Sequence, residues 1–124
     1  MATLDETVDT YVAAVSATDG AVRRSVLERC VSEDFEFWGV AGQARGREAF
    51  ACLLEDLQSQ SATPLALVRT TAIDSHHGWF RFAWEFRGPD GTAVLAGVDI
   101  GQVGDDGRIK SLVVFFNTPA STGS

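Results

Sequence analysis

Residues 92–117 constrain the fold of this chain more than any other stretch. Two long runs of apolar and β-branched residues flank a turn at residues 104–107, which reads Gly-Asp-Asp-Gly. Such runs favour strands, and glycine and aspartate tolerate the backbone angles of tight turns, so the stretch predicts a β-hairpin. Its first arm carries one carboxylate, Asp99, between Val98 and Ile100. An unpaired buried carboxylate is costly, so Asp99 needs a structural or chemical explanation.

A single domain, residues 1–124, is the organisation that this length favours. The composition, 45% hydrophobic and 22% charged, suits a globular chain with a substantial core. The formal net charge of −7 argues against nucleic acid and anionic membranes, because binding to either requires a basic face. We therefore expect neither of them among the partners.

The N-terminal residues predict a cytoplasmic protein. They lack the basic segment followed by an apolar run that marks a signal peptide, and no apolar run reaches the length needed to span a bilayer. In that setting Cys30 and Cys52 are expected to be reduced thiols on helices and not a disulfide.

Helical patterns fill the first half of the chain. Thr3 and Glu6 have the spacing of a capping box, and Gly20 is the expected stop of the helix that follows. Asp19 can cap a second helix that runs through Cys30. A third helix is expected over residues 47–58. The apolar stripe of the first helix contains Leu4, Val8, Tyr11, Val12 and Val15.

Strands and turns fill most of the rest. Residues 34–40 alternate like a short strand, and a glycine-bearing loop follows at residues 39–46. Strands are expected at residues 65–73 and 79–87, separated by a turn at residues 74–78. With the hairpin they form a four-stranded antiparallel meander. Helices that are segregated from an antiparallel sheet predict an α+β fold.

The strand at residues 79–87 places four large aromatic side chains on one face: Phe80, Phe82, Trp84 and Phe86. Each of them alone could simply fill the core. The row together favours a cavity between the sheet and the helices, because ligand sites are mostly apolar.

The hairpin strands need burial on both faces. Asp99 shares one face of its strand with glycines, whereas Val98 and Ile100 lie on the opposite face. The last strand repeats this pattern with Val113 and Phe115 on its opposite face. A sheet covered by helices on one side should show water a polar second face, so we expect a homodimer through this outer face.

The order of these elements and several short segments resemble the nuclear transport factor 2 superfamily, whose cone-shaped α+β domain includes ketosteroid isomerase and SnoaL-like cyclases. The segments are Tyr11-Val12-Ala13-Ala14, Arg45-Gly46, residues 82–86, Gly97-Val98-Asp99 and Asp106-Gly107-Arg108-Ile109. The resemblance covers nearly the whole chain. It implies three N-terminal helices packed on a curved, mainly antiparallel sheet that forms a cone-shaped cavity.

The resemblance to ketosteroid isomerase implies roles for two residues. In that family a tyrosine on the first helix and a protonated aspartate on a late strand donate hydrogen bonds to the substrate's oxyanion. Tyr11 and Asp99 fall at those positions. Burial should raise the pKa of Asp99 and keep it neutral and able to donate. The expected pocket residues are Phe37, Phe82, Trp84, Phe86 and Phe116.

The proton-shuttling aspartate of ketosteroid isomerase has no counterpart here. Its place near the end of the first strand is taken by Trp38 or Gly39, neither of which can move a proton. Glu36 is close in sequence, but alternation turns it away from the Phe35 and Phe37 side. Steroid isomerisation by the family mechanism is therefore not expected.

Two functions remain open. In the first, Asp99 is the acid or base of a small isomerase, cyclase or hydrolase acting on an apolar or cyclic ligand, and Tyr11 orients the substrate or stabilises negative charge. In the alternative, the chain is a non-catalytic ligand-binding or dimerisation module of the same fold. Asp99 would then be held by Tyr11 or a backbone amide.

We expect no cofactor and no metal. Adjacent histidines tend to point apart, so His76 and His77 beside Asp74 do not supply the three or four convergent ligands of a metal site. The acidic turn at residues 104–107 likewise lacks the spaced ligands of a calcium loop.

Overall fold

Three helices and seven strands form the computed structural model, which describes residues 3–40, 42–60 and 63–117. In chain order the elements are α1 (Leu4–Ser16), α2 (Gly20–Cys30), β1 (Val31–Trp38), β2 (Gln43–Arg45), α3 (Arg47–Ser59), β3 (Ala66–Arg69), β4 (Asp74–His76), β5 (Trp79–Arg87), β6 (Ala93–Val103) and β7 (Ile109–Phe116). The expected α+β class with three N-terminal helices is confirmed.

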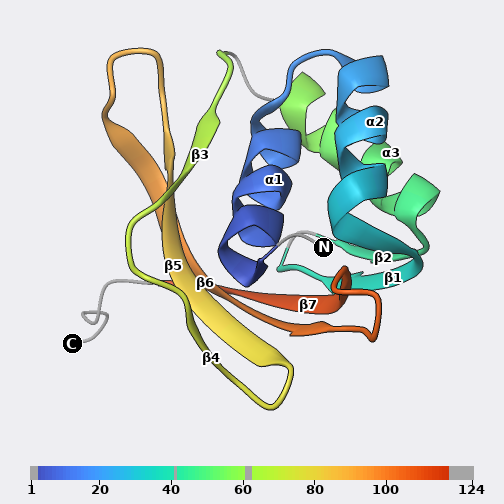
Figure 1. Cartoon of the computed structure of the whole chain (residues 1–124). Coiled ribbons are helices and arrows are strands. Elements are labelled where there is room, and N and C mark those ends of the chain that lie inside the picture. The colour runs from blue at the N-terminus through green and yellow to red at the C-terminus, as the bar shows by residue number, and fades with distance from the viewer. Residues whose placement is uncertain (1–2, 41, 61–62, 118–124) are drawn as a thin grey trace.

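The strands form one strongly bent sheet in the order β2-β1-β7-β6-β5-β3, with β4 also paired to β5. Every pair is antiparallel except β1 and β7, which run parallel. Figure 1 shows β3, β5 and β6 as one wall of the sheet, and β7, β1 and β2 as the other. The helices lie in the angle between the walls, as expected for a curved sheet that is covered on one side.

The helix starts follow from side-chain caps. Thr3 accepts a hydrogen bond from the Glu6 amide at 3.1 Å, and Glu6 accepts one from the Thr3 amide at 2.9 Å, so the capping box is confirmed. The expected stop at Gly20 is wrong. The first helix ends at Ser16, and Gly20 is the first residue of α2 because Asp19 accepts from the Ala21 amide at 2.8 Å and restarts the helix.

The predicted strand at residues 79–87 and the hairpin of β6 and β7 are confirmed. The predicted strand at residues 65–73 is too long, since β3 ends at Arg69. The predicted turn at residues 74–78 is mostly strand β4, and only His77 and Gly78 turn the chain. Their φ angles of 54° and 83° are the left-handed pair of a two-residue hairpin, which needs no longer loop.

Two features near β1 also differ from the sequence prediction. The strand begins at Val31, directly after α2, and it pairs with both β2 and β7. The expected loop at residues 39–46 contains β2, whose three residues are too few to show a period-two pattern. The sheet is therefore wider than the predicted meander, and its first strand lies beside its last.

Aromatic rings of β5 pack over glycines of β6. Trp84 is paired with Gly97 and Phe80 with Gly101 across the two strands. A Cβ atom on Gly97 would lie 2.5 Å from Cζ2 of Trp84, and one on Gly101 would lie 2.4 Å from Cζ of Phe80. Only glycine leaves room for the rings to lie flat on the sheet, so these pairs fix the direction of the Trp84 indole.

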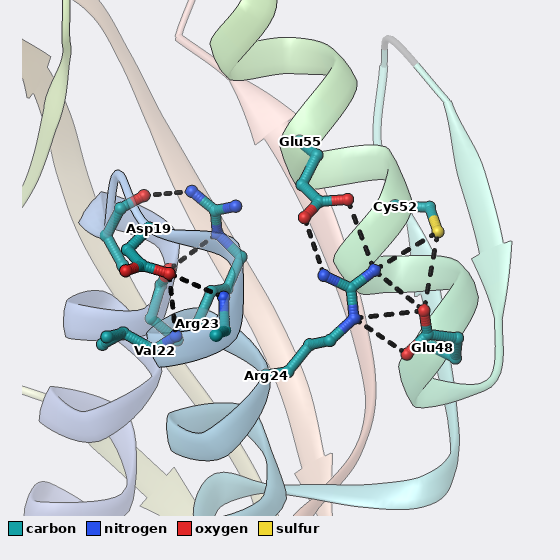
Figure 2. A network of polar contacts seen from close by, with 10 residues as sticks. Asp19, Val22, Arg23, Arg24, Glu48, Cys52 and Glu55 are labelled. Carbon is teal, nitrogen blue, oxygen red and sulfur yellow. Dashed lines mark hydrogen bonds and ion pairs between the residues drawn. The ribbon is translucent and has the colours of Figure 1, made fainter.

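Polar contacts join the helices on the side away from the sheet. Arg24 of α2 pairs with Glu48 at 2.8 Å and with Glu55 at 2.7 Å, both on α3 (Figure 2). The thiol of Cys52 lies 3.7 Å from the same guanidinium. Cys30 is buried and Cys52 exposed, and neither forms a disulfide. Such exposed ion pairs link α2 to α3 but add little stability.

Arg23 is a buried cation on α2, 1% exposed, that closes the end of α1. Its Nε donates to the Ala14 carbonyl at 3.2 Å, and its Nη2 donates to the Ala17 carbonyl. Ala14 lies in the last turn of α1 and Ala17 is its C-cap residue, and the helix dipole favours a positive charge at this end. Arg23 therefore fixes the α1–α2 corner from which Tyr11 is held against the sheet.

We expect Arg23→Met to lower the free energy of unfolding by about 2–4 kcal/mol, because one buried and one partly buried carbonyl lose a charged donor while the side-chain volume is largely kept. Denaturant titration at neutral pH measures this loss. Arg29→Met, on the exposed side of the same helix, is the control and should change stability by less than about 0.5 kcal/mol. Equal effects of the two changes would contradict the assigned role.

Candidate functional site

The carboxyl group of Asp99 lies inside the molecule, 2% exposed, in the middle of β6. Its Oδ1 accepts a hydrogen bond from the indole Nε1–H of Trp84 at 2.8 Å. Trp84 stands opposite Gly97, so its ring reaches along the inner face of the sheet to the residue two positions further on β6. The buried carboxyl of Asp99 thus has one hydrogen-bond partner among the described residues, and this partner, the indole of Trp84, is an uncharged donor.

A small apolar cavity adjoins this pair between the sheet and helices α1 and α3. Its volume is about 80 Å³. The lining residues are Tyr11, Val15, Phe37, Gly39, Val40, Gly42, Leu54, Leu67, Trp84, Phe86, Asp99, Val114 and Phe116. Tyr11 and Asp99 are the only ionisable groups in this lining, so the polar chemistry of the cavity rests on a phenol and a carboxyl.

Most of the expected pocket residues come together around this cavity: Phe37, Trp84, Phe86 and Phe116. Phe82 lies outside its lining. It is buried in the core and stacks on Phe80, with ring centroids 6.3 Å apart. Phe86 and Phe116 are only partly buried and each meets Trp84 edge-on, so the two phenylalanines close the cavity beside the indole.

Tyr11 projects from the buried stripe of α1 and stacks on Phe50 of α3, with ring centroids 6.1 Å apart. Within residues 3–40, 42–60 and 63–117 the Tyr11 hydroxyl has no hydrogen-bond partner, and Tyr11 does not form a hydrogen bond with Asp99. The expected alternative, in which Tyr11 or a backbone amide pairs with Asp99, is replaced by the Trp84 bond. The hydroxyl is therefore a donor that a bound molecule could use.

Burial dominates the electrostatics of the site. Removal from water raises the pKa of Asp99 to about 7, although the hydrogen bond from Trp84 opposes the rise by stabilising the charged form. Burial also raises the pKa of Tyr11 well above its ordinary value, and the charges of Asp99 and Cys30 raise it further. Near neutral pH Asp99 can therefore either give or take a proton, whereas Tyr11 stays a phenol.

No second acid or base reaches the cavity from the residues that the structure describes. Trp38 points to the outer face of the sheet, and Gly39 and Val40 lie at the cavity edge instead. Glu36 is also on the outer face, where it pairs with Arg45 at 3.2 Å. The absence of the ketosteroid isomerase base is therefore a property of the folded site as well as of the sequence.

The hydrogen bond from Trp84 to Asp99 is the feature of the candidate site that the sequence did not predict. Trp84 was expected only as part of the wall. The available signal was that Trp84 and Asp99 both face inward on neighbouring strands, and that a buried indole N–H usually finds an acceptor. The strand register, which the sequence does not show, places Trp84 opposite Gly97, two residues before Asp99.

The outer face of the sheet carries a larger but open groove of about 770 Å³. Its floor is Ile100 and Val113, and Trp38 and Trp79 stand at its two sides. Its remaining walls are mostly charged and solvated: Asp34, Glu36, Asp105, Asp106 and Lys110. We place the candidate site at the smaller cavity because only there are polar groups buried together in apolar surroundings.

His76 and His77 do not point apart as expected, because their Nδ1 atoms are 3.1 Å apart, but Asp74 turns away to pair with Arg81. Within the described chain, no group of three or more His, Cys, Asp or Glu side chains is arranged to hold a metal ion. None of the described helices combines the length and the apolar character of a membrane span.

The sequence model of the SnoaL-like domain matches residues 8–112, which is most of the chain. The chain belongs to the SnoaL-like domain family. A search of proteins with curated descriptions returned no match.

Solved structures agree with this membership. A SnoaL-like family protein from Agrobacterium tumefaciens strain C58, described as a suggested isomerase, is 26% identical with a TM-score of 0.85, covering 91% of this chain and 96% of that one. A suggested SnoaL-like polyketide cyclase from Jannaschia sp. CCS1 is 16% identical with a TM-score of 0.66, covering 95% and 90%.

A third structure has a ligand. A protein with a ketosteroid isomerase-like fold from Catenulispora acidiphila, in complex with trimethylamine, is 13% identical with a TM-score of 0.71, covering 90% of this chain and 85% of that one. At this identity the likeness shows the fold alone.

The Asp99 site makes a prediction about stability. Between pH 4 and 7 the folded chain keeps the Asp99 proton while the unfolded chain has released it, so stability falls as pH rises through this window and levels off above it. By pH 7.5 the raised pKa of Asp99 should lower the free energy of unfolding by about 4 kcal/mol relative to its value at low pH. Asp99→Asn should remove this pH dependence, measured as the difference in unfolding free energy between variant and wild type at pH 4 and pH 7.5.

Asp105→Asn, in the exposed turn between β6 and β7, is the control and should leave the profile between pH 4 and 7 unchanged. A wild-type profile that does not differ from that of Asp99→Asn would contradict a raised pKa for Asp99.

Proposed function

We propose that this SnoaL-like chain binds a small apolar ligand in the cavity around Asp99 and acts on it as an isomerase or cyclase. Asp99 is the single group that gives or takes a proton, and Tyr11 orients the ligand or stabilises negative charge on it. The observation that carries the proposal is the buried carboxyl with a pKa of about 7 beside a phenol in an apolar cavity. Acid–base catalysis is most effective when the pKa lies near the working pH.

The family supports the class of reaction. Relatives described as a suggested isomerase and a suggested polyketide cyclase share the fold and most of the chain length. We infer that either class of reaction would require a proton to be moved between atoms of the substrate, and Asp99 is the only carboxyl among the described residues that line the cavity. A single carboxyl can act first as the base and then as the acid, if it removes a proton from one atom of the substrate and returns that proton to another.

The volume of the cavity sets the size of the ligand. About 80 Å³ is below the roughly 150 Å³ of a cavity that accepts benzene and the roughly 300 Å³ at which most ligand pockets begin. Larger rings therefore need Phe86 and Phe116 to swing aside, and both side chains are only partly buried. The proposed ligands are small or flat molecules that enter between these two rings.

Asp99→Asn separates proton transfer from hydrogen bonding. The amide keeps an oxygen for the Trp84 N–H and offers an N–H to the cavity, but it cannot move a proton. Exchange of the α-hydrogens of cyclopentanone in deuterium oxide, followed by proton NMR, measures proton transfer without requiring the natural substrate. We expect the variant to slow protein-catalysed exchange by about 10²- to 10⁴-fold.

Tyr11→Phe should slow the same exchange by about tenfold, because the ring stack on Phe50 is kept while one donor is lost. Asp74→Asn, an exposed carboxylate on β4, is the control for general effects of charge and should leave the rate unchanged. Exchange by Asp99→Asn at the wild-type rate would rule out Asp99 as the acid or base.

The second candidate is a non-catalytic ligand-binding or dimerisation module, and the exposed outer face favours it. Four large side chains on this face are at least one third exposed: Trp38 at 38%, Trp79 at 48%, Val94 at 59% and Phe115 at 54%. Burying such a face is favourable, and a second copy of the chain is the proposed cover. The acidic groove between the indoles would oppose pairing at low ionic strength, so salt should strengthen it.

Phe115→Lys should convert the proposed homodimer to a monomer, because it places a charge in the middle of the apolar face. Sedimentation velocity at 0.05 M and 0.5 M salt measures both this effect and the effect of screening. Val22→Lys, an equally exposed apolar position on α2, is the control and should not change the oligomeric state. A wild-type monomer at both salt concentrations would contradict the dimer.

A further inference from the structure

Two neighbouring histidines at the tip of the β4–β5 hairpin direct their rings toward each other. The Nδ1 atoms of His76 and His77 are 3.1 Å apart, and the rings meet edge-on with centroids 5.3 Å apart. Side chains of successive residues in an extended strand point to opposite faces, so this convergence needs a local cause. The expectation that this segment holds no metal rested on rings that point apart, and these rings converge.

The backbone of the turn produces the convergence. His77 has a φ angle of 54°, and it is the only residue other than glycine with a positive φ in the described parts of the chain. This left-handed conformation turns its side chain back toward His76. Histidine adopts it more often than most residues do, although it remains uncommon. The turn is also anchored to the sheet, because the Gly78 carbonyl accepts a hydrogen bond from the Val103 amide at 2.9 Å.

The spacing of the two nitrogens suits either a shared proton or a shared metal ion. Two bare lone pairs, or two N–H groups, would repel each other at 3.1 Å, so one ring donates and the other accepts. Two imidazole nitrogens that bind one ion at about 2.0–2.1 Å are themselves about 2.8–3.4 Å apart, for angles between about 90° and 109° at the ion. Both side chains are exposed, so a rotation of each ring can turn both lone pairs to a common point in the solvent.

We propose that His76 and His77 together chelate a divalent transition-metal ion at the tip of the β4–β5 hairpin, each through Nδ1. The ion takes the place of the shared proton. At neutral pH the ring that carried this proton on Nδ1 loses it to the solvent and takes one up at Nε2, so both rings stay neutral and no net proton is released. Neither histidine lines the cavity around Asp99, and the inference does not depend on the proposed function.

The donor atoms set the class of ion. Neutral imidazole suits Cu²⁺, Ni²⁺ and Zn²⁺, whereas Mg²⁺ and Ca²⁺ prefer oxygen ligands. Asp74, the carboxylate on the same strand, is engaged by Arg81 at 3.0 Å. Cu²⁺ should therefore bind most tightly, as the general order of divalent metal affinities predicts. Water fills the remaining coordination positions, and an open hollow of about 270 Å³ beside His76 and Trp79 leaves room for it.

The first test reads the two rings directly, since His76 and His77 are the only histidines in the sequence. In protein labelled with ¹⁵N at the imidazole nitrogens, Zn²⁺ alone should shift the Nδ1 signals of both rings and leave both with a proton on Nε2. One ion per chain should complete the change. Mg²⁺ at the same concentration should change neither ring. Zn²⁺ that shifts only one ring, or neither, overturns the proposal.

The second test removes one ligand at a time. His77→Asn keeps the turn, because asparagine is favoured where a tight hairpin needs a positive φ. His76→Gln removes the other imidazole from β4. Each change should weaken Cu²⁺ binding at least about tenfold, measured by isothermal titration calorimetry in a buffer that does not coordinate metals. A smaller loss in either variant shows that the ion is held elsewhere and contradicts the chelate.

The matched control keeps two adjacent histidines but changes their direction. The double variant Ser75→His, His77→Asn carries its imidazoles on successive residues of β4, which point to opposite faces. It has the same charge and the same number of imidazoles as the wild type, and it should bind Cu²⁺ no more tightly than His77→Asn does. Wild-type affinity in this variant overturns the role of the turn. Thermal melts without metal check that every variant is folded.

The metal site and the proposed function can fail separately. Metal binding is read from histidine signals and from heat, and neither measurement needs turnover. His77→Asn, which weakens the metal site, should keep the cyclopentanone exchange rate that Asp99→Asn loses. An ion bound at Asp99 instead of at the turn would survive both histidine variants and would overturn this inference without touching the proposed acid–base role of Asp99.

Discussion

The hydrogen bond from the Trp84 indole to the buried carboxyl of Asp99 is the interaction on which the inner face of this molecule depends. Burial alone would drive Asp99 towards a permanently neutral acid, and a charged partner would hold it as a permanent carboxylate. An indole N–H does neither, because it stabilises the charge without supplying one. The pKa of about 7 is the balance of these two effects, so the carboxyl is partly protonated near neutral pH.

The same three strands supply the side chains of both faces of the sheet. Alternation along β5, β6 and β7 sends one set of side chains to the cavity and the other to the outer face. Phe80 and Trp84 of β5 need the glycines opposite them on β6. Asp99 lies between these two glycines on the inward face of β6. The apolar outer face is therefore not independent of the site, because each of its positions is set by a neighbour that faces inward.

Periodicity and turn chemistry predicted much of the fold and part of the site. The capping box, the cap at Asp19, the strand β5 and the final hairpin all have strong local signals, and all were confirmed. The three-residue strands β2 and β4 were missed because pairing with a neighbour, and not local pattern, makes them strands. For the same reason the sequence indicated Tyr11 and Asp99 but not the bond from Trp84, which depends on the register between two strands.

The parallel pairing of β1 with β7 places Val31 beside Ile109, so the first strand of the sheet lies against the last. No local hairpin can form this pair, and loop closure over most of the chain must precede it. β1 can pair early with its neighbour β2, but it lacks its second partner until β7 has been synthesised. Val114 and Phe116 belong to that strand, so the cavity acquires its final wall in the step that completes the sheet. A chain that stops before β7 lacks these two lining residues and therefore cannot form the complete cavity.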